Sequence, residues 1–83
     1  MTLEVVWEPL AVSLATRFLT DDAGGLGDLV EAVDALAEEP RPAQASPLGT
    51  SGLYRLRVGR YRAVDEVDEA SRMIKIGHIS RRA

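Results

Sequence analysis

The sequence predicts an α+β protein in which two helices pack on one face of a largely antiparallel sheet. Apolar residues recur at every second position near the N-terminus and again after residue 52, which is typical of strands. Between these stretches they recur at every third or fourth position, which is typical of helices. The predicted order is an N-terminal strand, a two-helix hairpin and a three-strand antiparallel meander (β-α-α-β-β-β). With 83 residues, the chain is expected to form one domain over 1–83.

The first strand is predicted over residues 2–8 and the first helix over 9–20. One face of the strand carries its apolar side chains, Leu3, Val5 and Trp7. Pro9 favours a helix start, because the first helical position needs no backbone N–H donor. The helix has the apolar spacing expected of a core-facing stripe: Ala11, Leu14, Ala15 and Phe18.

A second helix is predicted over 26–38, between a chain break at Gly24-Gly25 and a stop at Pro40. Its apolar stripe consists of Leu26, Leu29, Val30, Val33, Leu36 and Ala37. Its acidic residues lie on the opposite side, where we expect a solvated face. Residues 40–50 contain three prolines and a glycine, and they are predicted to form a loop.

The meander is predicted to consist of strands over 54–58, 61–67 and 73–78. Gly59 and Arg60 separate the first two strands, and a glycine in the first place of a two-residue loop favours a type II′ hairpin. This register places Arg57 directly opposite Arg62. The side of the sheet away from the core is then predicted to carry Arg55, Arg57 and Arg62, with Arg60 at the turn and Lys75 on the next strand.

Charge is unevenly distributed along the chain. Residues 1–50 hold two basic and nine acidic side chains, whereas residues 51–83 hold eight basic and four acidic ones. The sequence pI near 5.0 argues against indiscriminate nucleic-acid binding, but one positive face remains possible. One histidine and no cysteine exclude disulfides and a thiolate or His-rich metal site, and no cofactor is expected. We expect a cytoplasmic protein without a membrane segment.

The predicted arginine face indicates an anion site. Like charges directly opposite each other in a sheet cost a few tenths to about 1 kcal/mol, so an anionic ligand would relieve the repulsion. Arginine favours bidentate contacts to phosphate, and a groove of arginines suits a single-stranded nucleic acid backbone. The aromatic residues are predicted to lie in the core, so this face would hold phosphate better than bases. The alternative is an exposed face whose charge is neutralised by acids such as Glu66.

The sequence resembles the RelE/ParE superfamily of bacterial toxins. The resemblance covers nearly the whole chain and is most specific in the segment from Leu53 to Arg62, LYRLRVGRYR. It continues through three further matches: Glu66-Val67-Asp68-Glu69, Ile76-Gly77-His78, and Leu48-Gly49 before the arginine strand. It implies a toxin of a type II toxin–antitoxin system, neutralised by a cognate antitoxin. RelE-type members cleave mRNA in the ribosomal A site by attack of the 2′-hydroxyl on the adjacent phosphate, which inhibits translation.

The resemblance assigns catalytic roles to basic residues of the hairpin and of the chain after the last strand. It places Arg55 and Arg57 at the basic pair of the first hairpin strand and Arg62 at the arginine of the second. RelE enzymes also have an arginine where this chain has Ile79, so Arg81 or Arg82 is expected to replace it. The full set of site candidates is Arg62, Arg57, Arg55, Arg81 and His78 for catalysis, with Arg60, Lys75 and Arg82 for RNA binding.

Two residues leave alternatives open. His78 is the only side chain with an ordinary pKa near neutrality, which suits an acid or base. Its alternation with Ile74 and Ile76 nevertheless predicts that it faces the core. Asp65 is also predicted to face the core opposite Tyr54, with a hydrogen bond to the tyrosine hydroxyl or a place at the edge.

Two other functions remain open beside the mRNA endoribonuclease. ParE-type members of the superfamily inhibit DNA gyrase, which requires binding but no cleavage of RNA. A third possibility is a member that has lost catalysis and retains antitoxin binding only.

Overall fold

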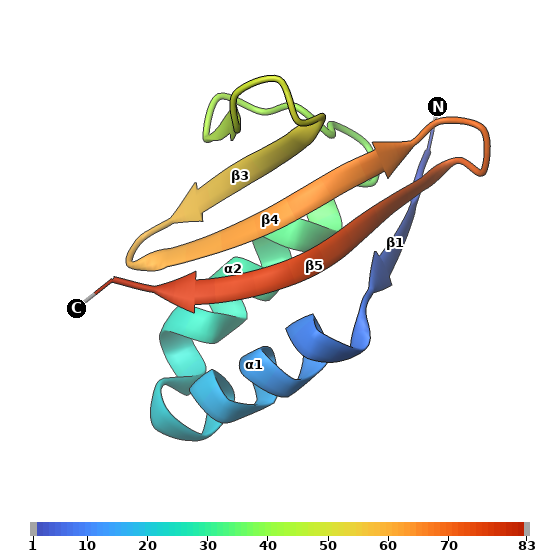
Figure 1. Ribbon diagram of the computed structural model, residues 1–83. Coiled ribbons are helices and arrows are strands. Elements are labelled where there is room, and N and C mark those ends of the chain that lie inside the picture. The colour runs from blue at the N-terminus through green and yellow to red at the C-terminus, as the bar shows by residue number, and fades with distance from the viewer. Residues whose placement is uncertain (1, 83) are drawn as a thin grey trace.

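The computed structural model describes residues 2–82. Its elements are β1 (Glu4–Trp7), α1 (Pro9–Asp21), α2 (Ala23–Ala35), β2 (Ala45–Pro47), β3 (Leu53–Val58), β4 (Tyr61–Asp68) and β5 (Met73–Arg81). The strands form one sheet in the order β1-β5-β4-β3-β2, and both helices cover the same face of it (Figure 1). The predicted α+β class and the antiparallel meander are confirmed. Neither helix in this part of the chain is long and apolar enough to cross a membrane.

The sheet is mixed, because β1 runs parallel to β5 while the other neighbours are antiparallel. The helical hairpin carries the chain from β1 across one face of the sheet, and β5 later returns beside β1 (Figure 1). Strand β2 was not predicted, since its residues lie within the prolines and glycine of the expected 40–50 loop. It pairs with the edge of β3, where Pro47 is tolerated because an edge strand has one side without ladder hydrogen bonds.

Helix α2 begins three residues earlier than predicted, so the expected break at Gly24-Gly25 is wrong. Asp22 is its N-cap, and its carboxylate accepts a hydrogen bond of 3.1 Å from the backbone N–H of Gly25. A Cβ at Gly25 would lie 2.3 Å from Asp22 Oδ2. The glycines therefore form the first turn of α2, and Gly25 allows the cap to approach closely.

The core lies between the helices and the sheet. The predicted stripes of both helices supply its lower layer, and alternate residues of the strands supply the upper one. The buried apolar residues are Leu3, Ala11, Leu26, Leu29, Val33, Leu36, Leu56, Tyr61, Ala63, Ile74, Ile76 and Ile79. Phe18 meets the ring of Tyr61 edge to face, with 5.5 Å between the ring centroids.

A β-bulge in β5 changes which side chains face the core. Asp65 pairs with Ile76 and Val64 pairs with His78, so Gly77 is an extra residue with no partner on β4. Beyond this point the alternation is shifted by one residue, so Ile79 is buried and His78 is exposed. The prediction that His78 faces the core is therefore wrong.

Candidate functional site

The hairpin of β3 and β4 has the predicted register. Arg57 lies opposite Arg62, and Val58 lies opposite Tyr61 across a two-residue loop. Gly59 has a φ of 57°, which a glycine adopts without strain, while Arg60 does not have a positive φ, as expected for a type II′ turn. The hairpin therefore directs Arg55 and Arg57 of β3 and Arg62 of β4 to the face of the sheet that the helices leave uncovered.

Four arginines gather on this uncovered face at the end nearest the hairpin turn. We call them the arginine cluster: Arg55, Arg57, Arg62 and Arg82. The pKa of Arg62 lies below the ordinary arginine value, first because the side chain is partly withdrawn from water and then because the other three arginines repel its charge. Within residues 2–82, none of the four forms an ion pair. The cluster thus concentrates positive charge that the described chain leaves unbalanced.

Arg62 is the best-positioned member of the cluster. Its Nη1 donates hydrogen bonds to the carbonyl oxygen of Tyr61 at 2.9 Å and to that of Gly59 at 3.2 Å. These bonds fold the guanidinium back onto the hairpin turn and fix its orientation. Its other N–H groups have no acceptor within the part of the chain that the structure describes. Arg62 is therefore oriented by the fold and still has donors for a ligand.

The β5 bulge adds His78 to the same face. Val64 pairs with His78 on one side and with Arg55 on the other, so Arg55 and His78 flank it in one row across three strands. The next row consists of Arg57, Arg62 and Ser80. A neutral imidazole can accept or donate a proton, whereas guanidinium groups remain charged. This face can therefore bind an oxyanion and has one group suited to proton transfer.

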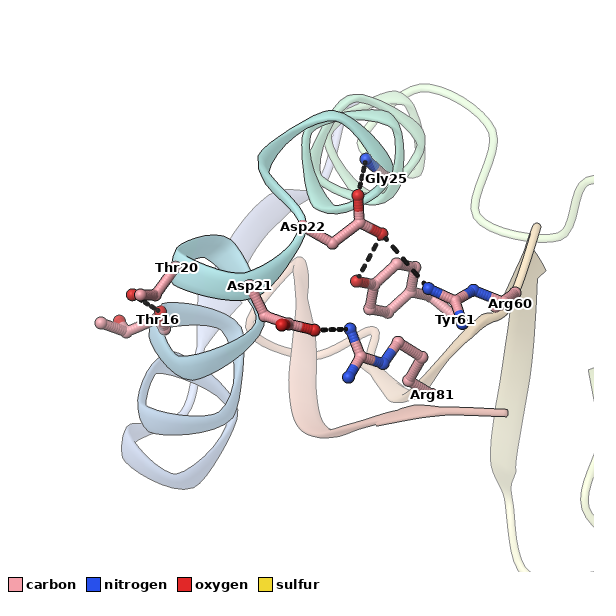
Figure 2. A network of polar contacts seen from close by, with 8 residues as sticks. All are labelled: Thr16, Thr20, Asp21, Asp22, Gly25, Arg60, Tyr61 and Arg81. Atoms are coloured by element: carbon pink, nitrogen blue, oxygen red, sulfur yellow. Dashed lines mark hydrogen bonds and ion pairs between the residues drawn. The ribbon is translucent and has the colours of Figure 1, made fainter. Parts of the chain in front are cut away.

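Two other predicted site residues, Arg60 and Arg81, point toward the helices instead. Arg81 forms an ion pair with Asp21 (Figure 2). Its guanidinium also lies 4.9 Å from the ring centroid of Phe18. The bond to Asp21 raises the pKa of Arg81. Arg60 lies 3.8 Å from Asp22 Oδ2 in the same corner. These two cations join the ends of the hairpin and β5 to the corner between α1 and α2.

Asp22 is the centre of this corner. Besides capping α2, its Oδ2 accepts a hydrogen bond of 3.0 Å from the hydroxyl of Tyr61 (Figure 2). The pKa of Asp22 is lowered, first by the bond from the Gly25 N–H and then by the Tyr61 hydroxyl. The corner therefore fixes the position of β4 just before Arg62.

Lys75 lies away from the arginine cluster. It sits opposite Glu66, three residues before His78 on β5, and its Nζ is 3.7 Å from Asp68 Oδ2. Glu66, the predicted neutralising acid, forms no ion pair among the described residues. The structure thus brings together Arg55, Arg57, Arg62, Arg82 and His78, and it separates Arg60, Arg81 and Lys75 from them.

Asp65 is buried as predicted, but its partner is different. Arg41 Nη1 donates to Asp65 Oδ1 at 2.8 Å, and the same guanidinium lies 3.6 Å from the ring centroid of Tyr54. The expected hydrogen bond from the Tyr54 hydroxyl is not formed. Asp65 Oδ2 is buried without a hydrogen-bond partner, and burial raises the pKa of this carboxyl despite the contact with Arg41. This contact ties the segment after α2 to the sheet.

Sequence reasoning missed the corner at Asp22 and the bulge at Gly77. A usable signal existed for both. An aspartate immediately before a helical stretch is a favoured N-cap, and a glycine inside a strand suggests a bulge. The pairing of Arg41 with Asp65 has no local signal, because 24 residues separate the two.

A family model and several solved structures match this chain. The model describes the ParE toxin of the type II toxin–antitoxin system parDE, and it matches residues 8–83. No curated protein sequence matches. A chain of the archaeal RelE–RelB complex from Pyrococcus horikoshii has 28% identity and a TM-score of 0.82, covering 100% of this chain and 98% of that one.

Two further structures share the fold at lower identity. A chain of a RelBE toxin–antitoxin complex from Mycobacterium tuberculosis has 21% identity and a TM-score of 0.81, covering 99% of this chain and 100% of that one. A YoeB/ParE toxin from Agrobacterium tumefaciens has 14% identity and a TM-score of 0.80, covering 98% of this chain and 100% of that one.

Proposed function

This chain belongs to the ParE toxin family of type II toxin–antitoxin systems, within the RelE/ParE superfamily, and from that premise we propose that it is a ribosome-dependent mRNA endoribonuclease. The observation that carries the proposal is the arginine cluster, whose charge no acid of residues 2–82 balances. A phosphodiester of mRNA in the ribosomal A site would be its ligand. Cleavage there would inhibit translation and arrest growth.

Arg62 is proposed to bind the scissile phosphate. Its guanidinium is oriented by two carbonyl oxygens of the hairpin, so little reorganisation is needed when charge builds up on the phosphate. Arg57 lies directly opposite and supplies a second guanidinium. Arg55 and Arg82 would bind the phosphates on either side, which explains why four cations gather where one phosphate needs fewer.

The proposed reaction needs two proton movements. The 2′-oxygen loses its proton and bonds to phosphorus, and the bond from phosphorus to the 5′-oxygen breaks. The products are a 2′,3′-cyclic phosphate and a 5′-hydroxyl, which takes up a proton. His78 is the one residue of this face suited to transfer a proton near neutral pH, because the bulge at Gly77 turns it outward.

The proposed dependence on the ribosome is supported by the lack of free aromatic rings on the described part of this face. Tyr61 is buried, and Arg41 lies over the ring of Tyr54, so neither ring is free to stack on a base. Trp7 and Phe18 pack against the core. Among residues 2–82, the sheet face therefore offers phosphate contacts but no stacking platform. The ribosome would supply the orientation of the mRNA that the chain does not.

The proposed protein partner is a cognate antitoxin. The Pyrococcus horikoshii structure is a RelE–RelB complex, and the Mycobacterium tuberculosis structure is a toxin–antitoxin complex. We propose that an acidic or amphipathic segment of the antitoxin crosses the β3–β4 hairpin and occupies the arginine cluster. Both the target and the antitoxin would be met in the cytoplasm.

Mapping of mRNA ends tests the proposal directly. Expression of the chain alone should arrest growth and produce cuts at fixed positions within codons, with 5′-hydroxyl ends. Purified protein should cleave mRNA on programmed ribosomes and leave the same free mRNA intact. Growth arrest with intact mRNA would exclude the endoribonuclease.

The second candidate is inhibition of DNA gyrase, which the match to the ParE family model favours. It requires the arginine cluster as a binding surface only, so His78→Ala should leave toxicity unchanged. DNA damage signalling without mRNA cleavage would support it. A chain that binds antitoxin but causes no growth arrest would instead be a member without toxic activity.

A further inference from the structure

A pocket opens at the edge of the sheet beside the arginine cluster. It lies between α2 and the end of β3 and has a volume of about 480 Å³, which is within the range of small-molecule sites. Arg57 of the cluster lines it from β3, while Glu39 and Gln44 line it from the segment between α2 and β2. The proposed function uses Arg57 for a phosphate and gives this pocket no role.

The pocket exists because β2 is short and the facing side chains of α2 are small. The ladder between β2 and β3 ends at the bond of 3.2 Å from the Arg57 N–H to the carbonyl oxygen of Gln44. Past this bond, β3 has no partner strand on this side among residues 2–82. Across from it, α2 presents Ala32 and Ala35, whose methyl groups leave the space open.

The pocket combines apolar walls with two polar side chains that have no partner. Leu56 and Val58 supply its wall from β3, and Pro42 supplies part of the opposite one. Glu39 and Gln44 are exposed, and neither side chain forms a hydrogen bond or an ion pair with another described residue. Apolar walls with a few free polar groups suit a flat ligand that has an apolar body and a polar edge.

The two polar side chains indicate which edge would fit. The carboxylate of Glu39 only accepts hydrogen bonds, whereas the amide of Gln44 can also donate them. Guanine presents two neighbouring donors, the N1–H and the 2-amino group, beside the acceptor O6. Adenine, cytosine and uracil do not offer two neighbouring donor groups to one carboxylate. An acceptor and a donor side chain together therefore match guanine better than the other three bases.

Arg57 connects the pocket to the arginine cluster. It lies opposite Arg62 on the hairpin and also lines the pocket, so a phosphate held by these two arginines lies beside the pocket entrance. A base of a single strand can turn out of its stack and bind through its hydrogen-bonding edge. An acidic segment of an antitoxin would instead meet Glu39 with like charge. A neutral base is therefore the better occupant.

We propose that the pocket between α2 and β3 binds a guanine base of the mRNA, next to the phosphate held by Arg57 and Arg62. Glu39 would accept from the N1–H and the 2-amino group, and Gln44 would donate to O6. The inference rests on the proposed function, because it names the base that the same site selects. Glu39 and Gln44 would then determine which codons are cut.

Binding of mononucleotides tests the pocket without the ribosome and without cleavage. The isotope-labelled full chain is titrated with GMP, AMP, CMP and UMP, and with ribose 5-phosphate as the reference that has no base. Amide chemical shifts report the affinity and the position of binding. We expect GMP to bind about tenfold more tightly than the other nucleotides, the discrimination of one bidentate contact to a base edge.

Glu39→Gln tests the carboxylate. It should remove the preference for GMP and leave the affinity for ribose 5-phosphate unchanged, because an amide of the same size cannot accept from both donors. Glu31→Gln is the matched control and should preserve the preference. The exposed acids of α2 all lie outside the pocket: Asp28, Glu31 and Asp34.

Ala35→Leu tests the space of the pocket. A larger side chain should lower the affinity for GMP to that for ribose 5-phosphate. Ala23→Leu is the matched control, since both alanines are exposed end residues of α2 and only Ala35 lines the pocket. Thermal melting of the variants should show that the fold is retained.

The same variants on programmed ribosomes separate this inference from the proposed function. Glu39→Gln should lower cleavage at codons with guanine by about tenfold and leave cleavage at other codons unchanged. Equal affinity for the four nucleotides, or a GMP preference that survives Glu39→Gln, would overturn the inference even if mRNA is cut. A GMP preference in a chain that cuts no mRNA would support the guanine pocket and overturn the proposed function. Loss of antitoxin binding in Ala35→Leu, with GMP binding retained, would assign the pocket to the antitoxin and overturn the inference.

Discussion

The uncovered face of the sheet and the helix layer leave groups of opposite kinds without partners. On the sheet, the guanidinium groups of Arg55, Arg57 and Arg82 lie near that of Arg62 and repel its charge. On the helix layer, three carboxylates of α2 lie near an apolar groove between the helices. Neither set of charges forms ion pairs within residues 2–82, and an anion bound on the sheet face would relieve the repulsion around Arg62.

At the corner where the helix layer meets the sheet, charged side chains of the two layers pair with each other and stabilise the fold. There Asp21 pairs with Arg81 and Asp22 with Arg60, so acids of the helix layer meet cations of the sheet (Figure 2). Residues 9–39 have a balance of −6, and residues 40–83, with nine basic and four acidic side chains, have +5. Part of this charge is neutralised where the layers meet. The charge that is not neutralised there faces outward, and we place phosphate and antitoxin binding on the positive charge of the arginine cluster.

The largest expected effect comes from Arg62→Ala. If Arg62 contacts the scissile phosphate as charge builds, its loss should lower the cleavage rate by roughly 10²–10³-fold, the range for removing one preorganised donor. Arg62→Lys should recover only part of this, because an ammonium keeps the charge but not the planar fork. The measurement is cleavage on programmed ribosomes, together with thermal melting to show that the fold is retained.

Arg17→Ala is the matched control on the helix layer. Arg17 is exposed and, in the described part of the chain, has no ion pair, so it serves as a cation outside the arginine cluster. Its removal should change neither cleavage nor melting. An Arg62→Ala protein that folds and remains as toxic as the Arg17→Ala protein would remove the arginine cluster from the proposed mechanism.

The corner around Asp22 should lose stability when a single methyl group is added at Gly25. Gly25→Ala would place a Cβ 2.3 Å from Asp22 Oδ2 and 3.0 Å from the ring of Tyr61. We expect a loss of about 1–3 kcal/mol in the free energy of unfolding, as for overpacked cores. Gly24→Ala, one residue away in open space, should instead gain up to about 1 kcal/mol. Denaturant unfolding of both variants measures the difference, and similar stabilities would contradict the close approach at Asp22.

The buried contact of Arg41 with Asp65 should give stability an unusual pH dependence. Burial raises the pKa of Asp65 in the folded state, so between about pH 4 and that raised value the folded chain holds a proton that the unfolded chain has lost. Unfolding free energy should therefore fall as pH rises through this window. The pKa values of Asp22 and Asp68 are lowered, so these two groups affect the unfolding free energy only below about pH 4. There the unfolding free energy should fall as the pH falls, because the unfolded chain takes up protons first.

Two substitutions separate the contributions of this contact. Asp65→Asn should flatten the stability curve above pH 4, because the titrating group is gone. Arg41→Ala should cost about 1–3 kcal/mol and steepen the fall, since the buried carboxylate then has no donor. Unfolding measured at a series of pH values gives both slopes. A wild-type curve that rises through this window would show that Arg41, not burial, controls the pKa of Asp65.

Much of the fold was predictable because it depends on local patterns. The two-residue loop at Gly59 and Arg60 predicted the hairpin register and placed Arg57 opposite Arg62, and the helical period predicted both core stripes. The errors occurred where a tertiary contact overrides a local rule. Gly24 and Gly25 form the first turn of α2 because Asp22 caps it, and β2 forms among prolines because the edge of β3 is available to pair with.

The candidate site was less predictable than the fold. One extra residue at Gly77 reverses the direction of every following side chain in β5, which moves His78 outward and Arg81 toward the helices. No alternation rule shows where such a shift occurs, although a glycine inside a strand signals that one is possible. The acidic partners of Arg60 and Arg81 lie 38 and 60 residues away along the chain, beyond any local pattern.

The smallest expected effect is on the salt dependence of antitoxin association, which should change with a substitution on the sheet face and not with one on the helix layer. An antitoxin that covers the arginine cluster with acidic residues should associate faster at low salt, because opposite charges steer the encounter. We expect its association rate to fall about three- to tenfold between 50 mM and 500 mM salt, and Arg57→Ala to reduce this dependence. Arg17→Ala on the helix layer should leave it unchanged. Stopped-flow mixing of the two purified proteins measures the rates, and a rate independent of salt would contradict the placement of acidic antitoxin residues on the cluster.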